Sequence, residues 1–219
     1  MNTIIFGSSD MAQMAKWYLD NDSKFKPVAF CVDSAYINQN TFEGLPVIAF
    51  EEIEKEFPPE TNSFFAPVYA TNMNQTREKI ADKIKNKNYN LISYINSKSN
   101  ISNAKIGSNC FLFEYVNLQP FTEIKDNVII WSQSHVGHHS IIKSNTFISG
   151  HVVIAGHCII DSYCFLATNS SYREKLHIAE GTFVGMGATV INDTEPWSVN
   201  IGTPAKKLDD KNSKDIKLK

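Results

Sequence analysis

Histidine is the residue type in this sequence that is best placed to do chemistry, because five of the six histidines lie within one short stretch. These five are His135, His138, His139, His151 and His157. Imidazole gains or loses a proton near neutral pH and is a common metal ligand, so the cluster predicts a proton-transfer site or a metal site. The sixth, His177, precedes an apolar residue and is expected at the surface.

A zinc site made from three histidines is one interpretation, with His135, His139, His151 and His157 as the candidates. Such a site would need histidines from neighbouring chains, and no pattern of carboxylates accompanies them. The four cysteines do not support a metal either, because none belongs to a Cys-x-x-Cys pair. We therefore predict that the protein holds no metal.

The elements that must position these histidines follow a strict six-residue period. Positions taken six apart from Ile106 to Val190 are all aliphatic except Tyr172, and the residue two places before each is nearly always small. This alternation is typical of a hexapeptide β-helix, in which three hexads close one triangular coil and neighbouring coils bury one another. The period predicts about five coils without a long inserted loop.

The phase of the repeat also predicts where individual side chains point. Cys110, Cys158 and Cys164 fall on small inward positions, so we expect buried, unreactive thiols. His138 follows the inward Val136 by two residues and would share its direction if the strand continued. The short strand ends there, and a polar ring inside a narrow apolar coil is costly. We therefore predict that His138 turns outward at the coil edge.

The first 95 residues have a different pattern, in which short apolar runs alternate with stretches of helical spacing. The predicted strands span residues 3–6, 27–32, 45–47, 64–69 and 91–94, and the predicted helices span residues 11–19, 51–57 and 75–84. This alternation predicts an α/β, Rossmann-like domain with a parallel sheet over residues 1–95. The all-β helix would occupy residues 96–208, and residues 209–219 would form a polar tail.

The loops that follow the predicted strands are candidates for ligand binding. After the first strand, one glycine stands where the dinucleotide fingerprint has three, so no NAD site is expected, although the loop amides can still hold an anion. Asp33 ends the second strand and either begins a turn or bonds a ribose or base edge. A helix start near residue 75 can neighbour a diphosphate. The predicted substrate-binding residues are Gly7, Ser8, Ser9, Asp33, Asn72 and Arg77.

Composition and charge exclude several classes of partner. The net charge of −2 argues against broad binding to nucleic acid or to membrane surfaces. No apolar run approaches the roughly 18 residues that a membrane span needs. The N-terminus has no basic region of the kind that opens a signal peptide, so a cytoplasmic location is expected.

A family resemblance follows from the Rossmann-like half, the hexapeptide coils and the Gly-Thr-Pro-Ala-Lys ending at residues 202–206. Over residues 1–208 the chain resembles the bacterial sugar N- and O-acyltransferases, which include sialic acid O-acetyltransferases and UDP-4-amino-sugar N-acetyltransferases of bacillosamine biosynthesis. The resemblance implies a left-handed β-helix and a homotrimer. It also implies acetyl-CoA in the groove between neighbouring β-helices and a sugar nucleotide in the N-terminal domain.

The resemblance also implies roles for individual residues. His138 matches the catalytic histidine, His139 stands where the family has an acidic partner, and Gly156 matches a glycine near the thioester. Gly156 is also the best candidate for an oxyanion donor, because glycine allows close approach. The predicted cofactor-binding residues are Phe147, Gly156, Ala167, Gly185, Gly187 and Lys206.

The predicted reaction is N-acetylation of a nucleotide-linked 4-amino sugar in bacterial surface glycan biosynthesis. UDP-2-acetamido-4-amino-2,4,6-trideoxyglucose is the favoured acceptor. A neutral histidine would take the proton that the amine loses as the C–N bond forms. O-acetylation of a sialic acid or a similar sugar is the alternative activity, and a non-enzymatic trimeric scaffold is a further alternative.

Overall fold

The computed structural model describes residues 1–218, which form two compact units. The first unit contains Met1–Tyr69 and Lys79–Tyr94, and the second contains Ala70–Glu78 and the chain from Ile95 onward. Each unit is described separately below. Within residues 1–218, no helix is long and apolar enough to cross a membrane.

The first unit is built on a six-stranded sheet with the order β3-β4-β2-β1-β5-β6. Its strands are β1 (Asn2–Phe6), β2 (Lys26–Val32), β3 (Thr41–Phe42), β4 (Leu45–Ala49), β5 (Asn62–Phe65) and β6 (Asn90–Leu91). All neighbours are parallel except β3 and β4. Its helical elements are α1 (Asp10–Asn21), η1 (Ser34–Tyr36), η2 (Phe50–Glu52), α2 (Ile53–Glu56) and most of α3 (Gln75–Asn86). The parallel pairing confirms the predicted parallel sheet, and the central β1 with a reversal of strand order beside it is a feature of Rossmann-like domains.

Two details of this sheet differ from the prediction. The strand expected over residues 64–69 ends at Phe65, because Pro67 has no N–H to continue the ladder. The short strand β3 was not predicted, and it pairs with β4 through a tight turn at Glu43 and Gly44, whose φ angles are 48° and 77°. Turns of this kind need left-handed residues, which the sequence signals here only through Gly44.

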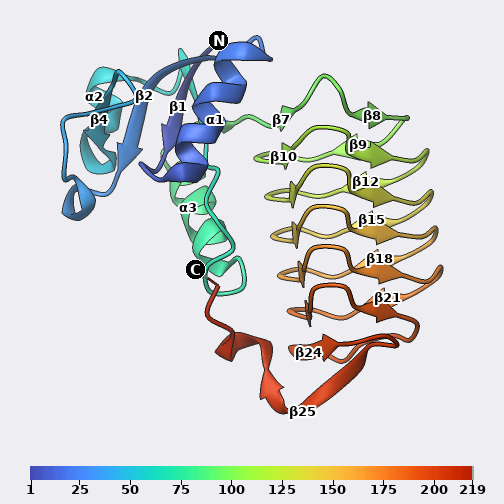
Figure 1. Cartoon of the computed structure of the whole chain (residues 1–219). Coiled ribbons are helices and arrows are strands. Elements are labelled where there is room, and N and C mark those ends of the chain that lie inside the picture. Colours follow the sequence, from blue (N-terminus) through green and yellow to red (C-terminus); the bar gives the residue numbers. More distant parts are fainter. Residues whose placement is uncertain (219) are drawn as a thin grey trace. The chain divides into compact units, whose positions relative to one another are not determined.

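The second unit is a left-handed parallel β-helix of mostly two-residue strands on three faces (Figure 1). Face 1 contains β7 (Tyr94–Ile95), β10 (Phe111–Leu112), β13 (Ile129–Ile130), β16 (Phe147–Ile148), β19 (Phe165–Leu166), β22 (Phe183–Val184), β24 (Ser198–Ile201) and β25 (Lys206–Asn212). Face 2 contains β8 (Asn100–Ile101), β11 (Asn117–Leu118), β14 (His135–Val136), β17 (Val153–Ile154), β20 (Ser171–Tyr172) and β23 (Thr189–Val190). Face 3 contains β9 (Lys105–Ile106), β12 (Glu123–Ile124), β15 (Ile141–Ile142), β18 (Ile159–Ile160) and β21 (His177–Ile178).

The interior of the β-helix confirms the six-residue period. The second residue of each strand points inward, and Ile142, Ile148 and Ile154 are fully buried. Tyr172, the exception in the period, is also buried, and its hydroxyl lies 3.1 Å from the Ser170 hydroxyl. A phenol is tolerated in this position because its polar end has a partner.

The predicted inward cysteines are buried as well. Cys110, Cys158 and Cys164 are all inaccessible to solvent. Burial raises the pKa of the Cys158 and Cys164 thiols. These thiols stay protonated and shielded, so none is suited to act as a nucleophile.

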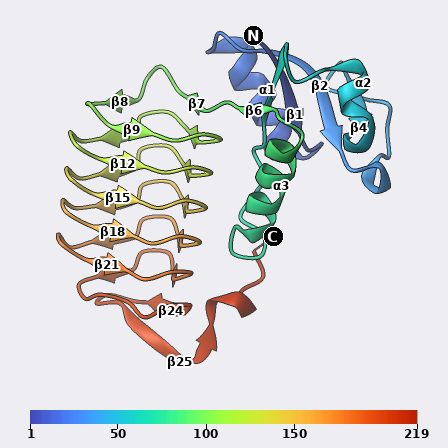
Figure 2. The same ribbon diagram turned by 180° about the vertical axis from the view of Figure 1, so that it is seen from behind.

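Each turn between strands contains one residue in the left-handed region of backbone conformation. From Asn103 to Gly187 these residues recur every six positions with φ between 53° and 67°. Residues 18 apart occupy equivalent positions in successive coils, as the pairing of Asn117 with His135 on face 2 illustrates. We name the corners by the faces that they join: the 1–2, 2–3 and 3–1 corners. Figure 2 shows the same stack of coils from behind.

The 3–1 corner carries a ladder of asparagine side chains. Asn109 donates to Asn127 and Asn127 donates to Asn145, each over 2.9 Å. Asn145 donates to Glu78 Oε1 over 2.8 Å, and the Tyr163 hydroxyl donates to the same oxygen over 2.7 Å. These bonds tie the segment of residues 70–78 to the coils of the second unit.

The C-terminal segment contains further regular structure after the last coil. β25 pairs antiparallel with β24 and extends to Asn212, and η3 (Ser213–Asp215) follows it. Part of the predicted polar tail is therefore regular secondary structure, which its run of charged residues did not indicate.

Candidate functional site

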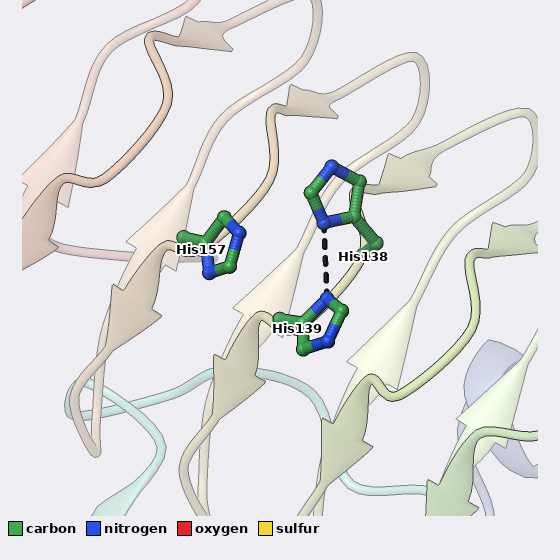
Figure 3. A group of neighbouring side chains, drawn as sticks. All are labelled: His138, His139 and His157. Atoms are coloured by element: carbon green, nitrogen blue, oxygen red, sulfur yellow. Dashed lines mark hydrogen bonds between the residues drawn. The ribbon is translucent and has the colours of Figure 1, made fainter.

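The 2–3 corner brings the predicted catalytic residues together in two successive coils. The turn between β14 and β15 carries His138 and His139, and the equivalent turn between β17 and β18 carries Gly156 and His157 (Figure 3). All three histidines are exposed. The predicted outward turn of His138 is therefore confirmed.

His138 is held by polar contacts on two sides. Its backbone N–H donates to Gln119 Oε1 over 2.9 Å, which fixes the turn against the preceding coil. Its ring Nδ1 lies 3.1 Å from Nδ1 of His139, and the two rings meet almost edge to face at 87°. Since Nδ1 is engaged in this bond, Nε2 is the nitrogen of His138 that remains for a substrate.

Gly156 lies directly against the ring of His138. A Cβ at this position would come within 2.8 Å of His138 Cε1 and Nε2, so only glycine leaves room for the ring. Among residues 1–218, no acceptor is hydrogen-bonded to the Gly156 N–H. The His138 ring and a Gly156 N–H without an acceptor among the described residues are therefore neighbours, and such a pair would suit acyl transfer to an amine.

The sequence analysis missed Phe121 in this corner, and it considered His157 only as a possible zinc ligand. Phe121 and His157 stand one coil before and one coil after His139, and all three have left-handed φ angles. The His139 ring lies between them, with centroid distances of 4.8 Å to Phe121 and 4.9 Å to His157. The spacing of 18 residues, three hexads, is the sequence signal that could have found them.

The other histidines have different surroundings. Asn117 Nδ2 lies 3.0 Å from Nδ1 of His135, so Nδ1 accepts and the ring proton is on Nε2. Burial lowers the pKa of His135 from its ordinary value of 6.5. His177 pairs with Asp161 over 2.7 Å, and His151 lies in the 1–2 corner. The histidine cluster is therefore limited to His138, His139 and His157 within the described residues.

The predicted cofactor residues other than Gly156 lie elsewhere on the β-helix. Ala167, Gly185 and Gly187 occupy the 1–2 corner, and Phe147 lies on face 1. Ala167 and Phe147 are buried, and a Cβ at Gly185 would come within 2.8 Å of Ile201. Gly187, with φ of 66°, faces open space instead.

The two groups of predicted residues therefore border face 2 on its opposite edges. His138 and Gly156 follow the strands of face 2, whereas Gly187 precedes β23 of the same face. Lys206, at the start of β25, is exposed. One chain by itself does not bring the predicted base and the predicted cofactor residues of the 1–2 corner to one place.

In the first unit, the predicted loop and Asp33 lie at one edge of the sheet. β1 and β2 are parallel neighbours with Phe6 opposite Cys31, so the chain leaves both strands at the same edge. Gly7 has φ of 110°, which favours glycine, and its N–H donates to Cys31 O over 2.8 Å. Ser9 forms the N-cap of α1, and Ser8 is half-buried between them.

Asp33 has a partner that the sequence analysis did not identify. Its carboxylate forms an ion pair with Lys83, and both side chains are about one-third exposed. The Lys83 ammonium also lies 4.4 Å from the centre of the Phe50 ring. Lys83 therefore holds the Asp33 carboxylate in place at the edge of the sheet.

Asn72 and Arg77 belong to the second unit. Asn72 is exposed and left-handed, with φ of 52°. Arg77 is fully buried, and within residues 1–218 its three guanidinium nitrogens have no hydrogen-bond partner. Burial lowers the pKa of Arg77 to about 9, which leaves it charged at neutral pH. As it lies here, Arg77 would have to rearrange before it could meet a diphosphate.

Comparison with solved structures gives several structural relatives, all at low sequence identity. No family model matches the chain. The acetyltransferase domain of PglB from Neisseria gonorrhoeae is 20% identical, with a TM-score of 0.81 over 94% of this chain and 99% of that one. PerB from Caulobacter crescentus, solved with CoA and GDP-perosamine, is 19% identical, with a TM-score of 0.83 over 95% and 97% of the two chains.

WeeI from Acinetobacter baumannii is also similar, with 19% identity and a TM-score of 0.67 over 95% of this chain and 100% of that one. The chain has the fold of these proteins. The matches extend over nearly the whole length of both chains, so the fold that they share includes both units described above.

Proposed function

We propose that this protein transfers the acetyl group of acetyl-CoA to the amino group of a nucleotide-linked 4-amino sugar. The observation that carries the proposal is the 2–3 corner, where an exposed His138 lies against Gly156, whose N–H has no acceptor among residues 1–218. The fold shared with PerB, which was solved with CoA and GDP-perosamine, supports the same activity.

The proposed chemistry uses these two groups on one reacting centre. The acceptor attacks the thioester carbonyl carbon as a free amine, which forms the C–N bond and places an electron pair on the carbonyl oxygen. Nε2 of His138 takes the proton that the amine loses, and the Gly156 N–H donates to the oxyanion. Collapse of the intermediate breaks the C–S bond, and the departing CoA thiolate receives the proton from His138.

Assembly as a homotrimer is part of the proposal. The base lies at the 2–3 corner, whereas Gly187 lies at the 1–2 corner, so a neighbouring copy would supply the second edge of a shared groove. Lys206 would meet a CoA phosphate there. Light scattering should give a mass of three times 24.7 kDa. A monomer with normal turnover would contradict the shared site.

The acceptor is proposed to bind the first unit at the edge of its sheet. The loop of residues 7–9 offers amides to phosphate, and Asp33 is available to a base or ribose. Lys83 joins this proposal because it positions Asp33. By family likeness we propose UDP-2-acetamido-4-amino-2,4,6-trideoxyglucose as the first acceptor to test.

The direct test is release of free CoA from acetyl-CoA against a panel of UDP-, GDP- and dTDP-linked amino sugars, with free sialic acid included. Turnover with a nucleotide-linked amino sugar is the expected result. Turnover with sialic acid alone would show that the activity is O-acetylation and not N-acetylation. Absence of turnover, combined with the absence of any thermal shift on adding acetyl-CoA or nucleotides, would contradict an enzymatic role.

A further inference from the structure

The three rings of the 2–3 corner form one contiguous cluster, although they come from two coils (Figure 3). His139 and His157 are stacked at 15° with their centres 4.9 Å apart. The ring of His138 meets both of them edge to face, at 5.3 Å and 4.9 Å. Phe121 closes the other side of His139 at 4.8 Å. His139 is therefore held between two rings while its Nδ1 faces His138.

A metal ion is one ligand that such a cluster could hold, because one nitrogen from each imidazole lies within 4.8 Å of the others. A bound ion must lie near the plane of each ring, about 2.0–2.1 Å from nitrogen. The rings of His139 and His157 are stacked with nearly parallel planes and centres 4.9 Å apart, so their lone pairs run side by side instead of converging. The geometry favours a hydrogen-bonded stack over a metal site.

The position of the proton between His138 and His139 decides whether His138 can act as a base. If His138 donates from Nδ1, its Nε2 keeps a lone pair beside Gly156. If His139 donates instead, a neutral His138 carries its proton on Nε2 and cannot accept another. Once His138 has been protonated at Nε2, only the first arrangement remains, and the bond becomes charge-assisted. An accepting His139 thus stabilises the protonated base.

The stack controls this bond through the orientation of His139. An exposed side chain at a turn would ordinarily rotate among several rotamers. Phe121 and His157 confine the His139 ring from both sides, and rotation out of the stack would remove Nδ1 from His138. Residue 175, which occupies the same corner position one coil further on, is a lysine, so the stack ends at His157.

We propose that His157 is a positioning residue, which stacks on His139 from the next coil and keeps it as the acceptor for Nδ1–H of His138. His139 and His157 together then do what a carboxylate partner would do for the base. The proposal rests on the proposed function, since it assigns His138 the role of the base.

The tautomer can be measured without any assay of acetyl transfer. The ¹⁵N chemical shifts of labelled histidines separate the Nδ1–H and Nε2–H forms, and a His138→Gln variant assigns the His138 signals. In the wild-type protein we expect a protonated Nδ1 and a bare Nε2 on neutral His138. In His157→Asn we expect a shift towards the Nε2–H form. A wild-type protein with Nε2–H on His138, or an unchanged tautomer in the variant, would overturn the proposal even if the enzyme acetylates its sugar.

The kinetic test compares two substitutions at one position. His157→Asn removes the ring but suits the left-handed backbone, and we expect kcat to fall about five- to tenfold, the equivalent of roughly one neutral hydrogen bond. His157→Phe keeps a stacking ring and should retain at least half of kcat. Lys175→Asn, which introduces the same residue one coil on at a φ of 62° against 61° for His157, is the matched control and should leave kcat unchanged.

Two outcomes contradict the stacking role. Equal activity of His157→Phe and His157→Asn, whether high or low, would show that the ring of residue 157 is not what matters. Loss of wild-type activity on treatment with a chelator, or a cobalt spectrum that disappears in His157→Phe, would show that the cluster holds a metal instead.

Discussion

The interior of the β-helix and its 2–3 corner are built from the same hexads, yet they restrict the sequence in different ways. In the interior, every hexad requires one aliphatic and one small residue. At the corner, the only shared requirement is a left-handed backbone conformation. Residues as different as Phe121, His139 and Lys175 adopt it. The contrast shows that all hexads contribute to stability. The proposed chemistry depends instead on a few side chains in successive coils of one corner.

This contrast predicts that mutations in the interior lower stability, whereas mutations at the corner lower activity. The largest effect on stability is therefore expected in the interior. Ile148→Ala removes a fully buried side chain from face 1 and should cost about 2–5 kcal/mol of unfolding free energy. The matched control is Ile159→Ala, at an outward position that is 38% exposed, with an expected loss under about 0.5 kcal/mol. Equal losses in urea unfolding would mean that the coil interior is not the source of stability.

A second comparison sets the first unit against the β-helix. Asp33→Ala should raise the KM for the nucleotide sugar about tenfold, through loss of one charge-assisted hydrogen bond. The KM for acetyl-CoA should stay unchanged, because that substrate is assigned to the β-helix. If both KM values rose equally, the substitution would have damaged the fold and not the pocket.

A third prediction separates the two corners of the β-helix. Gly187→Asn places a side chain in open space at φ of 66°, a conformation that Asn tolerates and that Asn169 adopts one coil earlier. We expect the KM for acetyl-CoA to rise about fivefold, roughly the loss of 1 kcal/mol of binding, with the sugar KM unaffected. An unchanged acetyl-CoA KM would remove the 1–2 corner from the cofactor site.

The smallest effect is expected from His135, on face 2 next to the corner. Because burial lowers its folded pKa below the ordinary 6.5, the unfolded chain binds the proton more readily. Stability should therefore fall as the pH drops through 6.5 and level off below the folded pKa. His135→Gln should remove this contribution to the acid sensitivity. Identical pH dependence of the melting temperature in both proteins would contradict the assignment.

The regular part of the structure was predictable because burial enforces it. An inward position that recurs every six residues from Ile106 to Val190 leaves one register for the coils, and a polar ring has no place inside them. That reasoning also predicted the exposure of His138. Placing His157 beside His139 required one further step, which was to apply the 18-residue repeat of successive coils. That repeat can be read from the sequence.

The remaining features are side-chain contacts and burial, which the spacing of residues in the sequence does not determine. The contact between Nδ1 of His138 and Nδ1 of His139 depends on side-chain rotamers. The ion pair of Asp33 with Lys83 joins residues 50 positions apart across the edge of the first sheet. The burial of Arg77 likewise could not be derived from its place in the first turn of a helix.

The central claim is that the 2–3 corner performs the chemistry with His138 as the base, and kinetics of His138→Asn test it most directly. General-base assistance is worth about 10²–10⁴-fold, so kcat should fall by that factor with both KM values near those of the wild type. The acidic limb of the kcat/KM profile should also disappear. A decrease under about fivefold with the acidic limb intact would contradict His138 as the base and leave alignment and the Gly156 amide to account for the rate.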